Sequence, residues 1–238
     1  MRNRFQILAG LITVFASLPA FADISVTQNI GPAATSWPSG TLLQVGTNPS
    51  SQLTVGESFG SGVTSIGETF TAPTDSNYLL QSVYLYVGTG TGTSAAAPLL
   101  VNLYDQGGQV APNPATYNTS SNLLGNGNGV SITYVSQAAG LIRLDFTGSD
   151  QVVLVAGHMY AFELAGTSGT TPLLWYRSIS DIYTGGAAYR NHGYINGTNA
   201  RDFGLAVSGA PTNQSGAPRL ATINGAVLHQ KIGGYGPG

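Results

Sequence analysis

The chain has 238 residues, of which 8 are basic, 10 are acidic, 3 are histidine and none is cysteine. A nucleic-acid-binding surface needs clustered lysine and arginine, so a chain whose single lysine is Lys231 is not expected to bind nucleic acid. The lack of cysteine excludes disulfide bonds and cysteine metal sites. Only 8% of the residues are charged, so hydroxyl and amide side chains must hydrate most of the surface. Such a surface suits an extracellular protein.

Residues 1–22 have the pattern of a secretory signal peptide. Arg2 and Arg4 precede an apolar segment, and a small-x-small cleavage site ends at Ala22. Removing these two arginines from the eight basic residues leaves six against ten acidic ones, a formal charge of −4 for a mature chain that begins at Asp23. No later apolar run approaches the roughly 18 residues of a membrane-spanning helix. We therefore expect a secreted or cell-surface protein without an integral membrane segment.

Period-2 alternation, or short apolar runs bounded by turn residues, predict β-strands throughout the mature chain. The expected strands are 24–30, 41–46, 65–71, 78–87, 99–104, 130–135, 141–146, 151–155, 158–164 and 202–207. Trp37 is expected to pack over one end of the core. Residues 47–62 lack a sustained period and are interpreted as a covering loop. The glycine-rich run 88–98 is interpreted as a flexible connection, and 110–129, rich in proline and asparagine, as a long surface excursion.

No segment of the mature chain keeps a capped helical period over several turns. The sequence therefore predicts an all-β fold, a single antiparallel β-sandwich of jelly-roll type with roughly ten to twelve strands. This domain is expected to span residues 23–207. Residues 208–238 are expected to form a linker-like C-terminal tail, with 221–228 as a candidate edge strand.

Several segments together resemble exported bacterial β-sandwich domains that are often joined to exchangeable surface anchors such as the PEP-CTERM sorting tail. The matching segments, which cover roughly Glu57 to Val207, are SFGSGVTSIGETFTAP, YLLQSVYLYVG, LLVNLYD, VVLVAGHMYAFEL, WYRS, YTGGAAYRN and ARDFGLAV. The resemblance implies an extracellular location and a jelly-roll-like sandwich, and association with polysaccharide or matrix by analogy. The end of this chain, KIGGYGPG, lacks the Pro-Glu-Pro motif, apolar span and basic terminus of that tail, so we expect no anchoring by that route.

The stretch 173–203, interpreted as a long aromatic loop between the last two core strands, concentrates the chemistry that sandwich proteins use to bind carbohydrate. Aromatic faces contact the apolar surfaces of sugars, while amides and guanidinium groups bond the hydroxyls. The candidate ligand-binding residues are Trp175, Tyr183, Tyr189, Arg190, Asn191 and Tyr194. The alternative is that these aromatic side chains are packed in the core. Alternation places Trp175 and Tyr176 on opposite faces of a strand, so at least one of them belongs to the core.

Two charge pairs are expected in the same stretch. Arg177 with Asp181, and Arg201 with Asp202, would hold the stretch on the sandwich, because a buried arginine needs a carboxylate partner. Substrate recognition by the same arginines is the less favoured interpretation.

Calcium is a candidate ligand, because exported sandwiches can use oxygen donors in turns. The candidate donors are Asp105, Asp150 and Asp181, which lie in or near turns with asparagine, glycine and serine. No DxDxDG spacing occurs, and calcium needs several converging oxygens. No other cofactor is indicated.

Enzymatic activity is not expected. A glycosidase needs two carboxyls that flank one bond, and the chain has three glutamates, Glu57, Glu68 and Glu163. Glu68 and Glu163 lie on expected strands, so their approach across a sheet is left open. A serine triad would need one of His158, His192 and His229, and no GxSxG motif accompanies them.

Three functions remain as hypotheses. The first is a non-catalytic module that binds glycan or another extracellular polymer through the aromatic stretch. The second is a structural or self-associating surface or matrix protein in which the same stretch is packed. The third, a small glycoside hydrolase, has the least support. Exposure of the aromatic rings favours the first hypothesis, and their burial favours the second.

Overall fold

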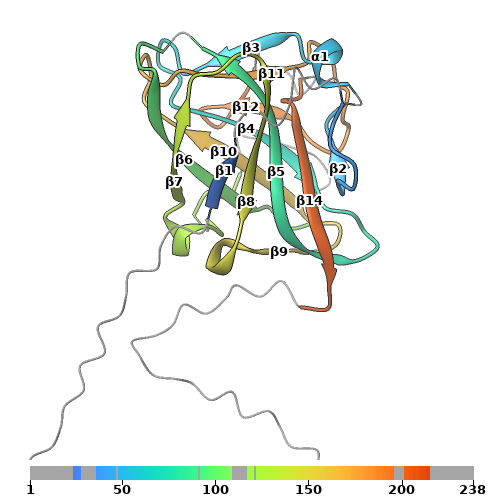
Figure 1. Ribbon diagram of the computed structural model, residues 1–238. Coiled ribbons are helices and arrows are strands. Elements are labelled where there is room, and N and C mark those ends of the chain that lie inside the picture. Colours follow the sequence, from blue (N-terminus) through green and yellow to red (C-terminus); the bar gives the residue numbers. More distant parts are fainter. Residues whose placement is uncertain are drawn as a thin grey trace, which may run out of the picture. The chain divides into compact units, whose positions relative to one another are not determined.

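The computed structural model describes residues 24–27, 36–46, 48–90, 92–108, 117–120, 122–195 and 201–214, which all lie within one compact unit at 22–219. The expected signal peptide at 1–22 and the candidate strand 221–228 lie outside the described residues. Two antiparallel sheets pack face to face (Figure 1). The all-β sandwich expected from the alternation is therefore confirmed.

One sheet has eight strands in the described part of the chain. Its path is β1 (Ile24–Thr27), β8 (Gly140–Phe146), β5 (Asn77–Thr89), β11 (Leu173–Arg177) and β3 (Val55–Ser58), with β14 (Leu205–Thr212), β2 (Leu43–Gln44) and β9 (Val153–Leu154) beside it. The 13-residue β5 pairs with β8, β9, β11 and β14. It is the strand around which this sheet is assembled.

The other sheet has six described strands. Their order is β13 (Gly193–Tyr194), β12 (Ala188–Arg190), β4 (Ser65–Thr71), β10 (Met159–Ala165), β6 (Ala96–Asp105) and β7 (Val130–Val135). Short helical turns occur at α1 (Pro49–Gln52), η2 (Gly125–Gly127) and η3 (Gly148–Asp150). None of the described helices is long and apolar enough to cross a membrane.

The core lies between the sheets because alternate residues of each strand point inward. Ile66 and Phe70 of β4 are fully buried in this core. Leu80, Val83 and Leu85 of β5 are fully buried on the opposite side of the core, in the eight-stranded sheet. Burying a side chain of this size stabilises a fold by roughly 1.5–3 kcal/mol relative to leaving it exposed.

Contrary to expectation, Trp37 does not pack over one end of the core but on the outer face of the eight-stranded sheet, where Tyr86 points away from the core side that Leu85 and Val87 occupy. Its side chain is buried in a small cluster with Leu53 and Tyr86. The indole N–H donates to the carbonyl oxygens of Val45, at 3.2 Å, and Gly46, at 2.8 Å. These bonds satisfy the only polar atom of the side chain, which a buried tryptophan requires.

Two segments differ from expectation. Residues 47–62 are not only a loop, because they contain α1 and β3, and β3 pairs with β11. All four β3 residues are half-buried, so this strand has no inside-outside alternation to detect. The last strand, β14, starts at Leu205 and continues to Thr212, five residues beyond the expected domain boundary at Val207. A register shift between Ser208 and Gly209 lets its glycine- and proline-containing end stay paired with β5.

Candidate functional site

The aromatic stretch links the two sheets rather than forming one long loop. It begins with β11 in the eight-stranded sheet and reaches β12 and β13 in the six-stranded sheet. We call residues 178–187, between β11 and β12, the crossover segment. The expectation of a single loop between the last two core strands was therefore wrong, since three short strands take up part of it.

Trp175 lies in the core and not at the surface. Its side chain is fully buried, stacked on Phe203 with ring centroids 4.6 Å apart and edge-on to Phe162 at 6.1 Å. The indole N–H donates to the carbonyl oxygen of Gly204 at 2.9 Å. Tyr176, on the opposite face of β11, is half-buried, which confirms that at least one of the two belongs to the core.

The candidate tyrosines are also engaged inside the molecule. Tyr189 is buried, and its hydroxyl donates to the carbonyl oxygen of Phe162 at 3.3 Å. Tyr183 is half-buried, and its hydroxyl accepts from the backbone N–H of Thr71 at 3.1 Å. Burial raises the pKa of both hydroxyls. Tyr194 pairs with Tyr189 across the β12–β13 hairpin, but its side chain lies outside the described part of the structure.

Arg190 and Asn191 serve different purposes. Arg190 is partly exposed and its Nη1 lies 3.5 Å from Glu57 Oε2. The Asn191 side chain makes four hydrogen bonds to a neighbouring loop: its Oδ1 accepts from Thr64 N and Oγ1 and from Ser65 N, and its Nδ2 donates to Gly62 O. Asn191 therefore fixes the position of the hairpin turn.

The expected pairing of Arg177 with Asp181 was wrong. Arg177 instead bonds Glu57 of β3, through Nε at 2.8 Å and Nη2 at 2.7 Å. Glu57 could not be identified as the partner because β3 was interpreted as loop. The expected charge pair of Arg201 with Asp202 was also wrong. Arg201 Nη1 donates a hydrogen bond to the carbonyl oxygen of Ile179.

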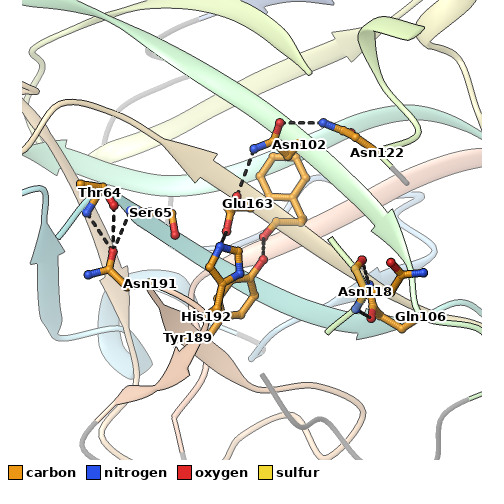
Figure 2. A network of polar contacts seen from close by, with 11 residues as sticks. Thr64, Ser65, Asn102, Gln106, Asn118, Asn122, Glu163, Tyr189, Asn191 and His192 are labelled. Atoms are coloured by element: carbon orange, nitrogen blue, oxygen red, sulfur yellow. Dashed lines mark hydrogen bonds and ion pairs between the residues drawn. The ribbon is translucent and has the colours of Figure 1, made fainter. Parts of the chain in front are cut away.

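One carboxylate stands out on the outer face of the six-stranded sheet. Glu163 of β10 is only 4% exposed, and its Oε1 accepts from Asn102 Nδ2 at 3.0 Å. Its Oε2 has no hydrogen-bond partner among the residues that the structure describes and lies 3.7 Å from Nε2 of His192, which is 48% exposed. Figure 2 shows the two side chains pointing toward one another. A buried carboxylate oxygen without a donor is costly, so this position favours an added donor.

A row of amides orients this carboxylate (Figure 2). Asn122 Nδ2 donates to Asn102 Oδ1 at 2.7 Å, which leaves Asn102 Nδ2 to donate to Glu163. Asn122 Oδ1 in turn accepts from the backbone N–H groups of Leu103 and Leu124. Gly129 leaves room for the row, since a Cβ there would lie 2.3 Å from Asn102 Oδ1.

Tyrosine rings border the same carboxylate. Burial, together with the charge of Glu163, raises the pKa of Tyr104 to about 12. Tyr189 lies beside His192 with nearly parallel rings, 23° apart and 6.4 Å between centroids. We call Glu163, His192, Asn102, Asn122, Tyr104 and Tyr189 the Glu163 cluster.

The turn that carries His192 has an uncommon backbone. Asn191 and His192 join β12 to β13 with φ of 45° and 59°. Two positive φ values in succession are typical of a tight hairpin turn, where glycine or asparagine is usual. A histidine there is strained, and the turn keeps it beside Glu163.

The expected calcium donors do not come together. Asp105 accepts from Gly107 N and contacts His158 Nδ1 at 3.1 Å. Asp150 is buried and accepts from Gly125 N at 2.7 Å, and Asp181 is exposed on the crossover segment. Within the described residues, no group of three or more histidine, aspartate or glutamate side chains is placed to hold a metal ion.

The pair of carboxyls considered for hydrolysis is separated by the sheet. Glu68 pairs with Phe162 of β10, a core residue, so Glu68 faces inward. Glu163 pairs with Gly67, the next position along β4, and therefore faces outward. The two carboxyls cannot flank one bond in a common cleft.

Sequence reasoning named Glu163 only as a possible acid and missed Asn102 and Asn122. The available signal was an acidic residue at an alternate position of an otherwise apolar strand, MYAFEL. No protein-family model matches the chain, and no curated protein matches it either. The functional conclusion therefore depends on this geometry.

Proposed function

We propose that this chain is an exported, non-catalytic module that binds a hydroxyl-rich extracellular polymer, such as a glycan, at the Glu163 cluster. The observation that carries the proposal is the unpartnered Oε2 of the buried Glu163 carboxylate beside the exposed imidazole of His192. The proposal keeps the ligand class expected from the sequence but moves the site away from Trp175.

The chemistry of the cluster suits a hydroxyl group. The gap of 3.7 Å between Glu163 Oε2 and His192 Nε2 is too long for a direct hydrogen bond. A ligand hydroxyl that donates to Oε2 can also accept from a protonated Nε2, and so satisfies both side chains. The exposed His192 marks the side from which such a group approaches, because Glu163 itself is nearly covered.

The absence of catalysis is part of the proposal. Glycoside hydrolysis uses two carboxyls on either side of one bond. Glu68, the acid closest along the neighbouring strand, points to the opposite face of the sheet. A single oriented carboxylate with amide neighbours is a recognition group.

A second candidate function is a structural or self-associating surface protein. It is favoured by the burial of Trp175 and Tyr189, because rings that other side chains cover cannot stack on a sugar. On this hypothesis the aromatic stretch ties the two sheets together and the molecule acts through assembly.

The test is calorimetric titration of the mature protein against a panel of soluble polysaccharides. Glu163→Gln keeps the shape of the side chain and its bond to Asn102 but removes the charge. His192→Asn removes the imidazole while tolerating the positive φ. A hydrogen bond to a charged group contributes about 1.5–3 kcal/mol, so each variant should bind roughly 10- to 100-fold more weakly.

Asp75→Asn, at an exposed acid, is the control and should bind as the unmodified protein does. Unchanged affinity in Glu163→Gln would refute the site. No binding to any polymer, with concentration-dependent assembly in sedimentation, would favour the structural role.

A further inference from the structure

A second carboxyl, Glu68, is placed inside the sandwich. It occupies an inward position of β4 between Ile66 and Phe70, and its side chain is fully buried. Its Oε2 accepts from the backbone N–H of Phe203 at 2.7 Å. This bond links the six-stranded sheet to the chain that enters β14.

Asp202, the residue before Phe203, is also fully buried. Its Oδ2 accepts from the backbone N–H groups of Ile182, at 2.7 Å, and Tyr183, at 3.2 Å, in the crossover segment. The backbone of Asp202 exchanges further bonds with Ser178, whose N–H donates to Asp202 O and whose hydroxyl accepts from Asp202 N. Asp202 therefore holds the crossover segment, and Glu68 holds the chain directly after Asp202 on the six-stranded sheet. We call these two carboxyls the acid pair.

Each carboxyl of the acid pair has one oxygen without a partner. Glu68 Oε1 and Asp202 Oδ1 are buried and make no hydrogen bond within the described part of the chain. Among the described residues, the ion pairs involve other acids, Asp145, Asp105, Glu57 and Glu163, and none involves the acid pair. A buried carboxylate needs a counter-charge or donors, and without them it takes up a proton instead.

The neighbouring titratable groups add negative charge. Burial, followed by the charge of Asp202, raises the pKa of Glu68 well above its usual value. Burial raises the pKa of Asp202 to about 7, against the two backbone N–H groups that favour its charged form. Asp181 raises the pKa of both, and the other groups facing the pair are Tyr183 and Tyr189.

We propose that the acid pair is a proton-dependent attachment that holds the crossover segment on the sandwich most tightly at acidic pH and releases it progressively as the pH rises. The buried oxygens without a partner, and the lack of an ion-pairing base among the described residues, carry the proposal. The release affects the chain around Ile182, Tyr183 and Phe203, because the backbone N–H groups of these residues donate to the two carboxyls. It does not depend on any ligand of the Glu163 cluster.

The direction of the pH dependence follows from the difference in bound protons between the attached and the released state. The attached state keeps protons that the released state, with ordinary carboxyl pKa values near 4, gives up. Attachment is therefore strongest below about pH 4 and weakens as the pH rises through the value of about 7 for Asp202. For each proton lost, the opening equilibrium increases about tenfold per pH unit within this window.

The experiment is amide hydrogen exchange across that pH range. The amides of Ile182, Tyr183 and Phe203 should show opening equilibria that rise about tenfold per pH unit, once the intrinsic pH dependence of exchange is removed. Amides at the centre of β10 provide the internal reference. Asp202→Asn and Glu68→Gln keep an oxygen acceptor but cannot ionise, so in each variant the pH dependence should fall.

The control is Asp75→Asn, which should behave as the unmodified protein does. The proposal is overturned if the three amides open to the same extent at every pH. It is also overturned if calcium chloride closes them and a chelator reverses this, since a cation would then hold the pair. Trp175 emission checks that each variant folds, and either single variant suffices for the comparison.

Discussion

The ion pair between Glu57 and Arg177 gives a quantitative prediction for the junction of β3 and β11. The Arg177 and Glu57 side chains are 8% and 15% exposed, and Glu57 Oε1 accepts from Nε at 2.8 Å and Nη2 at 2.7 Å. Removing one partner leaves the other charge buried, which costs about 3–5 kcal/mol for fully buried pairs. Because Glu57 is partly accessible, we expect Glu57→Leu and Arg177→Met each to lower the free energy of unfolding by about 3 kcal/mol.

The double replacement should cost much less than the sum of the two. Apolar residues that replace a buried ion pair are often neutral or stabilising, so we expect the double variant to unfold within about 1 kcal/mol of the unmodified protein. Urea unfolding followed by tryptophan emission measures all three, since Trp175 lies opposite Glu57 in the pairing of β11 with β3. Arg143→Ala is the matched control, because its pair with Asp145 is more exposed, at 37% and 24%. That loss should cost at most about 1 kcal/mol. Additive costs in the double variant would refute the reasoning.

Three further predictions concern packing and the turn. Trp175→Ala should lower the free energy of unfolding by about 3–5 kcal/mol in urea titration, because it empties a stacked core position, and a loss below about 1 kcal/mol would contradict the assigned burial. Asn191→Gly, which keeps the positive φ but removes four hydrogen bonds, should cost about 1–3 kcal/mol. Gly129→Ala should weaken polymer binding in calorimetry more than Gly108→Ala, because only the former places a Cβ against Asn102 Oδ1.

The sequence predicted strands well where one face is buried and the other is not, or where turn residues mark both ends of the strand. The observed bounds of β4 and β7 match the expected 65–71 and 130–135, because β7 alternates strictly and β4 is flanked by clear turn residues. β3 could not be predicted, since its four residues are equally half-buried. The end of β14 was missed because Gly209 and Pro211 are typical of a linker, and only pairing with β5 holds them in a strand.

The candidate site was harder to predict than the fold. Aromatic content drew attention to Trp175 and Tyr189, but composition does not tell which side of a sheet a ring occupies, and both are buried. The Glu163 cluster joins residues from β6, β10 and the β12–β13 turn, which are far apart in the chain. A contact such as that of Asn122 with Asn102 depends on a loop whose course has no local periodic signal.

The measurement that tests the location of the site most directly is NMR titration of the mature protein with the polymer that binds in calorimetry. We expect the side-chain amide of Asn102 and the ring of His192 to shift with saturation, while the indole N–H of Trp175 stays unchanged in the core. Shifts centred on Trp175 and the crossover segment, with Asn102 and His192 unaffected, would contradict the assignment of the ligand to the Glu163 cluster.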